Sequence, residues 1–360
     1  MRTKGIALLA VLALVAIGQS CVTAVNKNAL GSQTAYLTLP TVNGVAVYNI
    51  TDSLNFEPVV GSPYIGGESP SSLVVHPTKG IIYVSNQGDN TISLFKIDPT
   101  SRGLVEVHPR TRTQIFPTSL CIDQAGAHLF ALNVGSASIS AFSISSGDGS
   151  LTEVAGSPFA TYTNPTSMIA SPSGKFLYVL NVNVRLLYGY ANNNGTLQAI
   201  PGSPFAVGAT PSSVVIDPAE KFMYVTDSGS NTVTAYTIDA NGTPTKVPQS
   251  PFVTDTTPVA SLIDPSGQFL YIGHSGANDI WAYAIDSSTG IPTLLDTNSS
   301  VPSNHPALMH MDTTGRIVFV VNSSGKLITS FSLDSTTGEL TATNQTTTIS
   351  WPLTSMAVIK

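Results

Sequence analysis

One stretch decides the fold of this chain: from Pro211 to Phe252 it reads PSSVVIDPAEKFMYVTDSGSNTVTAYTIDANGTPTKVPQSPF. Four short runs rich in β-branched and aromatic residues follow one another, each bounded by Gly, Pro, Asn, Asp or Ser. The run from Thr232 to Asp239 alternates apolar and polar residues, which is typical of a strand with two unlike faces. The stretch therefore predicts a unit of four short β-strands.

The same unit recurs along the chain. The proline that opens it stands at Pro70, Pro117, Pro165, Pro211, Pro258, Pro306 and Pro352, with spacings of 47, 48, 46, 47, 48 and 46 residues. Four strands in a unit of this length are typical of a β-propeller blade. A helical repeat would instead need apolar residues at spacings of three and four, which these runs lack.

The two ends of the chain complete each other. Six full units run from Pro70 to about Pro352, the stretch Thr34 to Ser69 lacks a first strand, and Leu353 to Lys360 reads as a first strand alone. We expect the strand Thr354 to Ile359 to pair with the N-terminal strand that starts near Tyr36 and so close the ring. The predicted fold is all-β, a seven-bladed β-propeller of four-stranded antiparallel blades.

The N-terminus has the features of an export signal. Arg2 and Lys4 precede an apolar run that is too short to span a bilayer comfortably, and small residues follow. Two cleavage sites compete: residues 1–24 form an ordinary signal peptide, or residues 1–20 form a lipoprotein signal and Cys21 becomes lipidated. We expect a short linker over 25–33, a single propeller domain over 34–360, and a periplasmic, outer-membrane or extracellular location.

Composition excludes several classes of partner and cofactor. Charged residues make up 10% of the chain and the net charge is −6, so no basic stripe is present to neutralise nucleic-acid phosphates. The chain has two cysteines, and Cys121 falls within a predicted inner strand, where a small buried hydrophobe is expected. No metal or cofactor is predicted, and a membrane partner is expected only through a lipid on Cys21.

Two segments of the repeat carry a family resemblance. They are Tyr83-Val84-Ser85-Asn86 with Asn90-Thr91-Ile92, and Tyr224-Val225-Thr226-Asp227 with Asn231-Thr232-Val233. The chain resembles the propellers with YVTN repeats and, more widely, the lactonase-type seven-bladed propellers that include 6-phosphogluconolactonase. The resemblance covers nearly the whole chain after the signal and implies the same fold.

The resemblance also implies where chemistry would take place, and here the chain departs from its relatives. Lactonase-like members place His, Arg and a carboxylate around the central channel, and often carry G-P-R-H and D-L-G-x-D segments. Neither occurs here, and the nearest counterpart, Ser85 to Asp89, lacks the first acidic residue. The sequence therefore favours a binding or scaffolding module that holds a protein or a glycan, with hydrolysis of a sugar or organic-acid lactone as the alternative.

Aligning the seven units shows which residues break the repeat. His274 ends a second strand where most units have Asn, and His305, later in the same unit, stands directly before the proline that opens the next unit. With Asp227 one blade earlier, a neutral imidazole would activate water while the carboxylate fixes its tautomer, and Arg185 would hold a substrate carboxylate or an oxyanion. His310 stands in an aliphatic column of the inner strands, as a second substrate-binding candidate or a core histidine that needs a hydrogen-bond partner.

Each of these candidates also has a structural interpretation. His274 would cap the turn after its strand, as Asn does in sister units, while His305 and Arg185 would be solvated loop residues. Convergence of His274, His305, Arg185 and an acid in one pocket would favour the enzyme, and scattering would favour the binding module.

Overall fold

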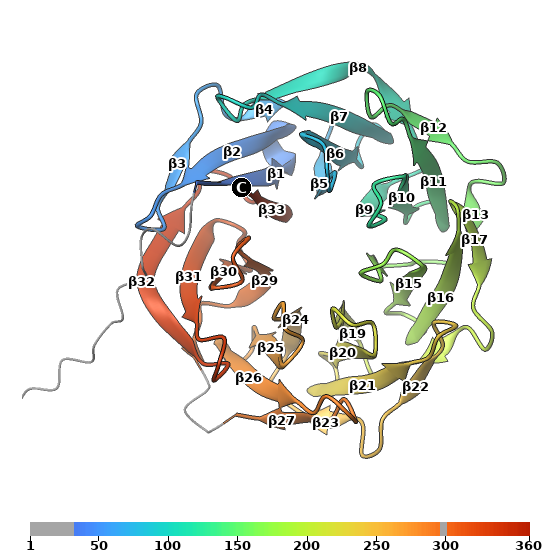
Figure 1. Ribbon diagram of the computed structural model, residues 1–360, viewed down its shortest axis with the longest axis vertical. Coiled ribbons are helices and arrows are strands. Elements are labelled where there is room, and N and C mark those ends of the chain that lie inside the picture. The colour runs from blue at the N-terminus through green and yellow to red at the C-terminus, as the bar shows by residue number, and fades with distance from the viewer. Residues whose placement is uncertain (1–31, 296–300) are drawn as a thin grey trace, which may run out of the picture.

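Seven antiparallel sheets surround a common axis in the computed structural model (Figure 1), which describes residues 32–295 and 301–360. We number the blades in chain order. Blade 1 contains β1 (Gln33–Leu39), the 3-10 turn η2 (Pro40–Val42), β2 (Gly44–Ile50), β3 (Phe56–Pro58), β4 (Tyr64–Ile65) and β33 (Ser355–Ile359). Blade 2 contains β5 (Pro70–Val75), β6 (Ile81–Asn86), β7 (Thr91–Ile97) and β8 (Leu104–Arg112). The predicted seven-bladed propeller is confirmed.

The middle blades repeat this order. Blade 3 contains β9 (Pro117–Ile122), β10 (His128–Asn133), β11 (Ser138–Ile144), β12 (Leu151–Glu153) and β13 (Phe159–Ala160). Blade 4 contains β14 (Ser167–Ala170), β15 (Phe176–Asn181), β16 (Leu186–Asn193), β17 (Thr196–Ala199) and β18 (Phe205–Ala206). Blade 5 contains β19 (Pro211–Ile216), β20 (Phe222–Asp227), β21 (Thr232–Ile238), β22 (Pro244–Lys246) and β23 (Phe252–Val253).

The last two blades complete the ring. Blade 6 contains β24 (Pro258–Ile263), β25 (Phe269–His274), β26 (Asp279–Ile285), β27 (Pro292–Leu294) and β28 (Val301–Pro302). Blade 7 contains β29 (Pro306–Met311), β30 (Ile317–Asn322), β31 (Leu327–Leu333) and β32 (Leu340–Thr348). No helix among the described residues is long and apolar enough to cross a membrane.

The outer part of most blades differs from the simple four-strand prediction. In five blades the fourth strand stops early, and a two-residue fifth strand pairs with the other end of the third strand. The serine of the Gly-Ser-Pro-Phe segment fills the break, because its hydroxyl accepts a backbone N–H from the third strand. This bond joins Ser250 to Ala235 at 2.9 Å and Ser62 to Val47 at 2.9 Å. These repeated serines are therefore structural.

The core lies between neighbouring blades, where the aromatic residue of the second strand is buried. Tyr83, Tyr178, Tyr224 and Tyr271 each donate the phenolic O–H to a glycine carbonyl in the next blade, for example Tyr224 to Gly290 at 2.8 Å. A buried tyrosine keeps its apolar area in the core only if its hydroxyl finds a partner. The Tyr-Val pair of the repeat thus joins each blade to the one that follows.

The N- and C-terminal strands close the ring as predicted. β33 pairs antiparallel with β1, from Thr34 opposite Ile359 to Thr38 opposite Ser355. The Thr38 and Thr354 hydroxyls, 316 positions apart in the sequence, lie 2.9 Å from each other. β1 begins at Gln33, which the sequence placed in the linker. The predicted signal segment and Cys21 lie outside the described residues.

Candidate functional site

One rim of the propeller carries most of the predicted site residues. The first strands begin and the second strands end there, because Pro211 pairs with Asp227 and Pro258 with His274. We call this rim the proline rim. The residues that precede six repeat prolines have left-handed backbone, with φ between +46° and +58°: Ser69, Phe116, Asn164, Thr210, Thr257 and His305. A non-glycine residue with left-handed backbone is uncommon, so we expect a hydrogen bond to stabilise the backbone at each of these strand starts.

In four of these six places, an asparagine of the preceding blade forms a hydrogen bond with the residue before the proline. Asn43, Asn90, Asn231 and Asn278 each accept, at the side-chain oxygen, the backbone N–H of the residue before the next proline. For His305 this bond to Asn278 is 3.1 Å long. Arg185 occupies the same column in blade 4, with φ of +57°, and is exposed. Among the described residues its guanidinium has no hydrogen bond or ion pair, so it is available to a ligand.

His274 lies inside a closed hydrogen-bond network. Its side chain is fully buried, Nδ1 lies 2.8 Å from Asp279 Oδ1, and Nε2 lies 2.6 Å from the Thr254 hydroxyl. The Thr254 oxygen lies 2.7 Å from the Tyr283 hydroxyl, and Trp281 Nε1 donates to Asp279. Burial lowers the pKa of His274, and the carboxylate of Asp279 opposes that shift. The ring is therefore neutral at neutral pH and enclosed on both nitrogens.

The same network occurs in blade 3 without histidine. There the Thr113 hydroxyl donates to Asn133 Oδ1 at 2.9 Å, and Asn133 Nδ2 donates to Ser140. Thr113 and Thr254 hold equivalent places, because each donates its backbone N–H to the carbonyl of the rim asparagine, Asn90 or Asn231. The geometry of His274 is thus that of the turn cap supplied by Asn in sister blades.

Asp227 is an acid in the same asparagine column. Its side chain is 0% exposed, and Oδ2 accepts the Thr234 hydroxyl at 2.6 Å. Oδ1 has no hydrogen-bond partner among the described residues. Gly208 covers the group so closely that a Cβ there would lie 2.4 Å from Oδ2. Burial raises the pKa of Asp227 to about 6, and the bond from Thr234 opposes the shift.

His305 and His310 lie in different surroundings. His305 is exposed on the proline rim, with Nδ1 3.2 Å from the Asn304 side chain, and its backbone joins the turn that follows His274. His310 is partly buried on the inner strand β29, and burial lowers its pKa to about 4. Its ring has no hydrogen-bond partner among the described residues, although a core histidine was expected to have one.

The structure therefore gathers the candidates on one side of the ring without joining them. Asp227, His274, His305 and Arg185 all lie on the proline rim of blades 4 to 6, but no hydrogen bond or ion pair in the described chain links any two of them. The sequence did not predict Thr254 and Asp279 as partners of His274. Asp279 could have been noticed, because it is the one acidic residue that begins a third strand among the seven blades.

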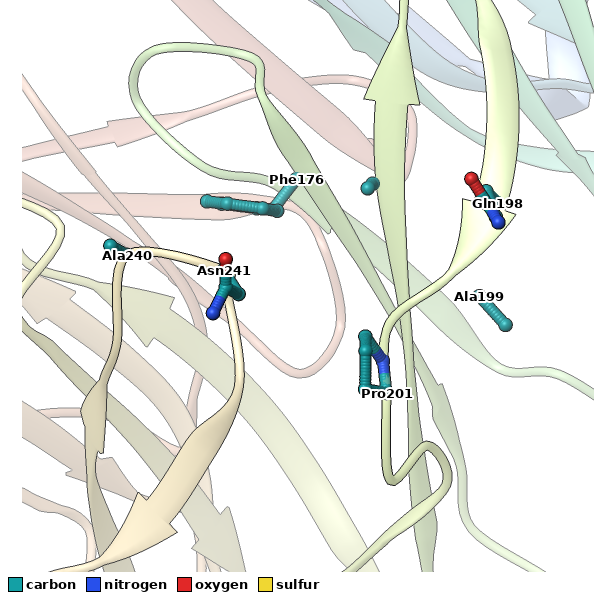
Figure 2. Close-up of a pocket in the computed structure, with 7 residues that line it drawn as sticks. Phe176, Gln198, Ala199, Pro201, Ala240 and Asn241 are labelled. Atoms are coloured by element: carbon teal, nitrogen blue, oxygen red, sulfur yellow. The ribbon is translucent and has the colours of Figure 1, made fainter.

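A separate pocket lies at the opposite rim. It has a volume of about 330 Å³ and is lined by Phe176, Ala191, Gln198, Ala199, Pro201, Ala240 and Asn241 (Figure 2). These residues belong to blade 4 and to the outer turn of blade 5. The pocket contains none of the predicted site residues, so the proline rim remains the candidate site.

Comparison with known proteins agrees with this architecture. The family model described as lactonase, 7-bladed beta-propeller, matches residues 26–164 and 164–356. No curated protein sequence matches the chain.

Solved structures show the same fold. A periplasmic gluconolactonase of Pseudomonas aeruginosa superposes with a TM-score of 0.77 at 18% identity, covering 91% of this chain and 99% of that one. A candidate 6-phosphogluconolactonase of Bacteroides fragilis gives 0.78 at 18% identity, covering 91% and 98%. Hydrazine synthase of Kuenenia stuttgartiensis gives 0.58 at 16% identity over 80% and 91%. Such likeness shows the fold alone. With the family model matched over nearly its whole length, the chain belongs to the lactonase family of seven-bladed β-propellers.

Proposed function

We propose that the protein hydrolyses a lactone at the proline rim. Family membership supports this reaction, and two of the similar structures carry lactonase names. The comparisons support hydrolysis better than the binding or scaffolding role that the sequence favoured. The proposal therefore rests on family membership and on Asp227, since the predicted residues do not converge in one pocket. The observation that carries the proposal is Asp227, a buried carboxyl group whose raised pKa of about 6 suits a general base near neutral pH.

In the proposed reaction, water adds to the lactone carbonyl and the ring C–O bond breaks. Ionised Asp227 accepts a proton from the attacking water, and the leaving alkoxide gains a proton to become the alcohol of the hydroxy acid. His305 is exposed on the same rim and supplies that proton, while Arg185 binds the carboxylate that forms. Gly208 covers Asp227, so the segment around it must move to admit water. His274 precedes the turn whose Asn278 accepts the backbone N–H of His305.

Purified protein without the signal segment should be assayed with a panel of sugar and simple lactones by pH-stat titration. We expect hydrolysis above the spontaneous rate, increasing with pH as Asp227 ionises near pH 6. Asp227→Asn should lose about 100-fold or more of kcat, since a general base contributes about 100- to 10,000-fold. Asp255→Asn is the matched control, because Asp255 also lies on this rim.

Two results would contradict the proposal in different ways. Absence of hydrolysis with every lactone overturns the reaction. Hydrolysis that is unchanged in Asp227→Asn leaves the reaction standing and removes Asp227 as its base.

Export is a separate proposal that rests on the N-terminal sequence. Arg2, Lys4 and the apolar run that follows would direct the chain out of the cytoplasm, with cleavage after residue 24 or lipidation of Cys21. Cell fractionation of wild type and Cys21→Ser tests both forms. A lipoprotein leaves the membrane fraction when Cys21 is replaced, whereas a signal-peptidase substrate does not change.

A further inference from the structure

Apolar side chains are exposed on the proline rim of two neighbouring blades. Ile115 is 50% exposed, Phe116 53%, Tyr162 51% and Val184 39%. They come from the segment before blade 3, the segment before blade 4, and the turn between β15 and β16. Scattered exposed apolar residues are ordinary, but a cluster on one face marks an interaction surface.

These residues form one surface, which we call the blade 3–4 platform. The turn 134–137 of blade 3 lies at its centre, and a Cβ on Gly135 would lie 2.6 Å from Ile115 and 2.7 Å from Phe116. On the other side of this turn, the Ala137 carbonyl accepts the N–H of Thr161, the residue before Tyr162. Blades 3 and 4 are adjacent in the ring (Figure 1). The two exposed aromatic rings therefore flank a single turn.

Tyr162 is supported from below by a residue that breaks the repeat. Its ring stacks on Tyr188, with centroids 5.8 Å apart and planes 12° apart. At the position of Tyr188 in the third strand, sister blades have Ser93, Ser140 or Thr234, which bond to the buried residue at the end of the second strand. In blade 4 that hydroxyl is replaced by a ring, which holds Tyr162 in place while leaving half of it open to solvent.

The charge on the platform has one sign. Its rim segments, 113–116, 134–137, 161–164 and 182–185, contain no Asp or Glu, and Arg185 is their one charged residue. Acidic residues of this face lie outside the platform, for example at Glu68 and Asp89 of blade 2, where Asp89 pairs with Arg110, and at Asp255 before blade 6. The same segments also carry amide and hydroxyl side chains, among them Gln114, Ser136 and Asn183. The ligand must therefore combine apolar faces, hydrogen-bonding edges and negative charge.

We propose that the blade 3–4 platform binds an acidic carbohydrate. A pyranose ring presents a face of C–H groups to an aromatic ring and hydroxyls at its edge, which matches exposed Phe116 and Tyr162 on segments that also carry polar side chains. A uronic-acid carboxylate matches the unpaired guanidinium of Arg185, which can bind it through two parallel N–H···O bonds. The platform shares Arg185 with the proposed hydrolytic site, but its binding of an acidic carbohydrate requires no hydrolysis.

Isothermal titration with a short oligogalacturonate tests the proposal, with the methyl-esterified oligosaccharide as the uncharged counterpart. Tyr162→Ala and Phe116→Ala should each weaken binding of the acidic form about tenfold, while Tyr162→Phe keeps wild-type affinity. Arg185→Gln should weaken the acidic form about tenfold and leave the ester unchanged. Because all three side chains are exposed, the variants should unfold at the wild-type temperature, which circular dichroism checks.

Matched controls come from other surfaces. Val253→Ala replaces an 80% exposed apolar residue on β23, and Arg316→Gln replaces an exposed arginine at the opposite rim. Both should bind as wild type, and so should Asp227→Asn, which separates this platform from the proposed hydrolysis. Absence of saturable binding to both oligosaccharides overturns the proposal. So does wild-type affinity in both Tyr162→Ala and Arg185→Gln, or an equal loss for acid and ester in Arg185→Gln.

Discussion

His274 and Asp279 are joined by a 2.8 Å hydrogen bond that fixes the direction of every proton in the network around them. A carboxylate only accepts, so the imidazole carries its proton on Nδ1 and its Nε2 accepts from the Thr254 hydroxyl. Thr254 then accepts from Tyr283. The hydrogen bonds therefore run in one direction, from Tyr283 through Thr254 and His274 to Asp279. Each of these buried polar groups has a partner, which stabilises the turn between β25 and β26.

Replacing His274 tests this structural role. His274→Ala leaves Thr254 and Asp279 without their partner, so the free energy of unfolding should fall by about 3 kcal/mol. His274→Asn, which restores the residue of sister blades, should cost about 1 kcal/mol. Urea denaturation measures both values, with exposed His305→Ala as the control that changes stability by less than about 0.5 kcal/mol. A cost for His274→Ala no larger than that of His305→Ala would show that the network contributes little.

Asp227→Asn should stabilise the protein in a pH-dependent way. The folded-state pKa of Asp227 is raised from 3.8 to about 6, so the folded protein favours the neutral acid and loses stability as the pH rises through that value. The variant, with the Asn of sister blades, should gain up to about 3 kcal/mol above pH 6 and nothing below pH 4. Urea denaturation along a pH series measures the difference. A gain that is the same at all pH values would contradict the raised pKa.

His310 should make the protein sensitive to acid. Its folded-state pKa is lowered from 6.5 to about 4, so its contribution to stability is present above the unfolded value and is lost as the pH falls from 6.5 to 4. His310→Leu introduces the residue found in the same column at Leu262, because His310 and Leu262 face the equivalent aromatic residues Phe319 and Tyr271. The variant should lose about 3 kcal/mol less than wild type over that interval. Thermal unfolding at a series of pH values measures this effect, and parallel curves for the two proteins would refute it.

Removal of the closing strand should prevent cooperative folding. Without residues 354–360, β1 loses its partner and Met356 and Val358 leave the core between blades 1 and 7. Near-ultraviolet circular dichroism and size-exclusion chromatography should show loss of fixed tertiary structure and association of chains. Removal of Lys360 alone, which lies beyond β33, should change neither measurement.

The repeat made the fold predictable and left the site only partly so. Proline spacing gave the number of blades, and aligned columns singled out His274, which stands where most units have Asn, with Asp227 one blade earlier. The partners of these residues come from crossing segments such as Thr254 and Gly208, which belong to the preceding strand connection. Their placement depends on how neighbouring blades pack, and no local pattern encodes it.

The blade 3–4 platform shows the same limit. Phe116 was recognisable as a residue before a repeat proline, but its exposure is a property of the folded surface. Tyr188 is visible in the sequence as one of two rings, with Trp281, in a column that is Ser or Thr in four other blades. Its stacking with Tyr162 depends on where the segment that connects blade 3 to blade 4 lies. That segment matches no repeated column of the sequence, so its position could not be predicted.

The pairing of β1 with β33 also orders events during synthesis. β1 leaves the ribosome first among the described strands, and β33 leaves last. Blades 2 to 7 can form from neighbouring segments as they emerge, whereas β1 keeps one open edge until translation is nearly complete. A nascent chain therefore depends on protection of that edge against pairing with other chains, and an incomplete chain that has been released remains a target for quality control.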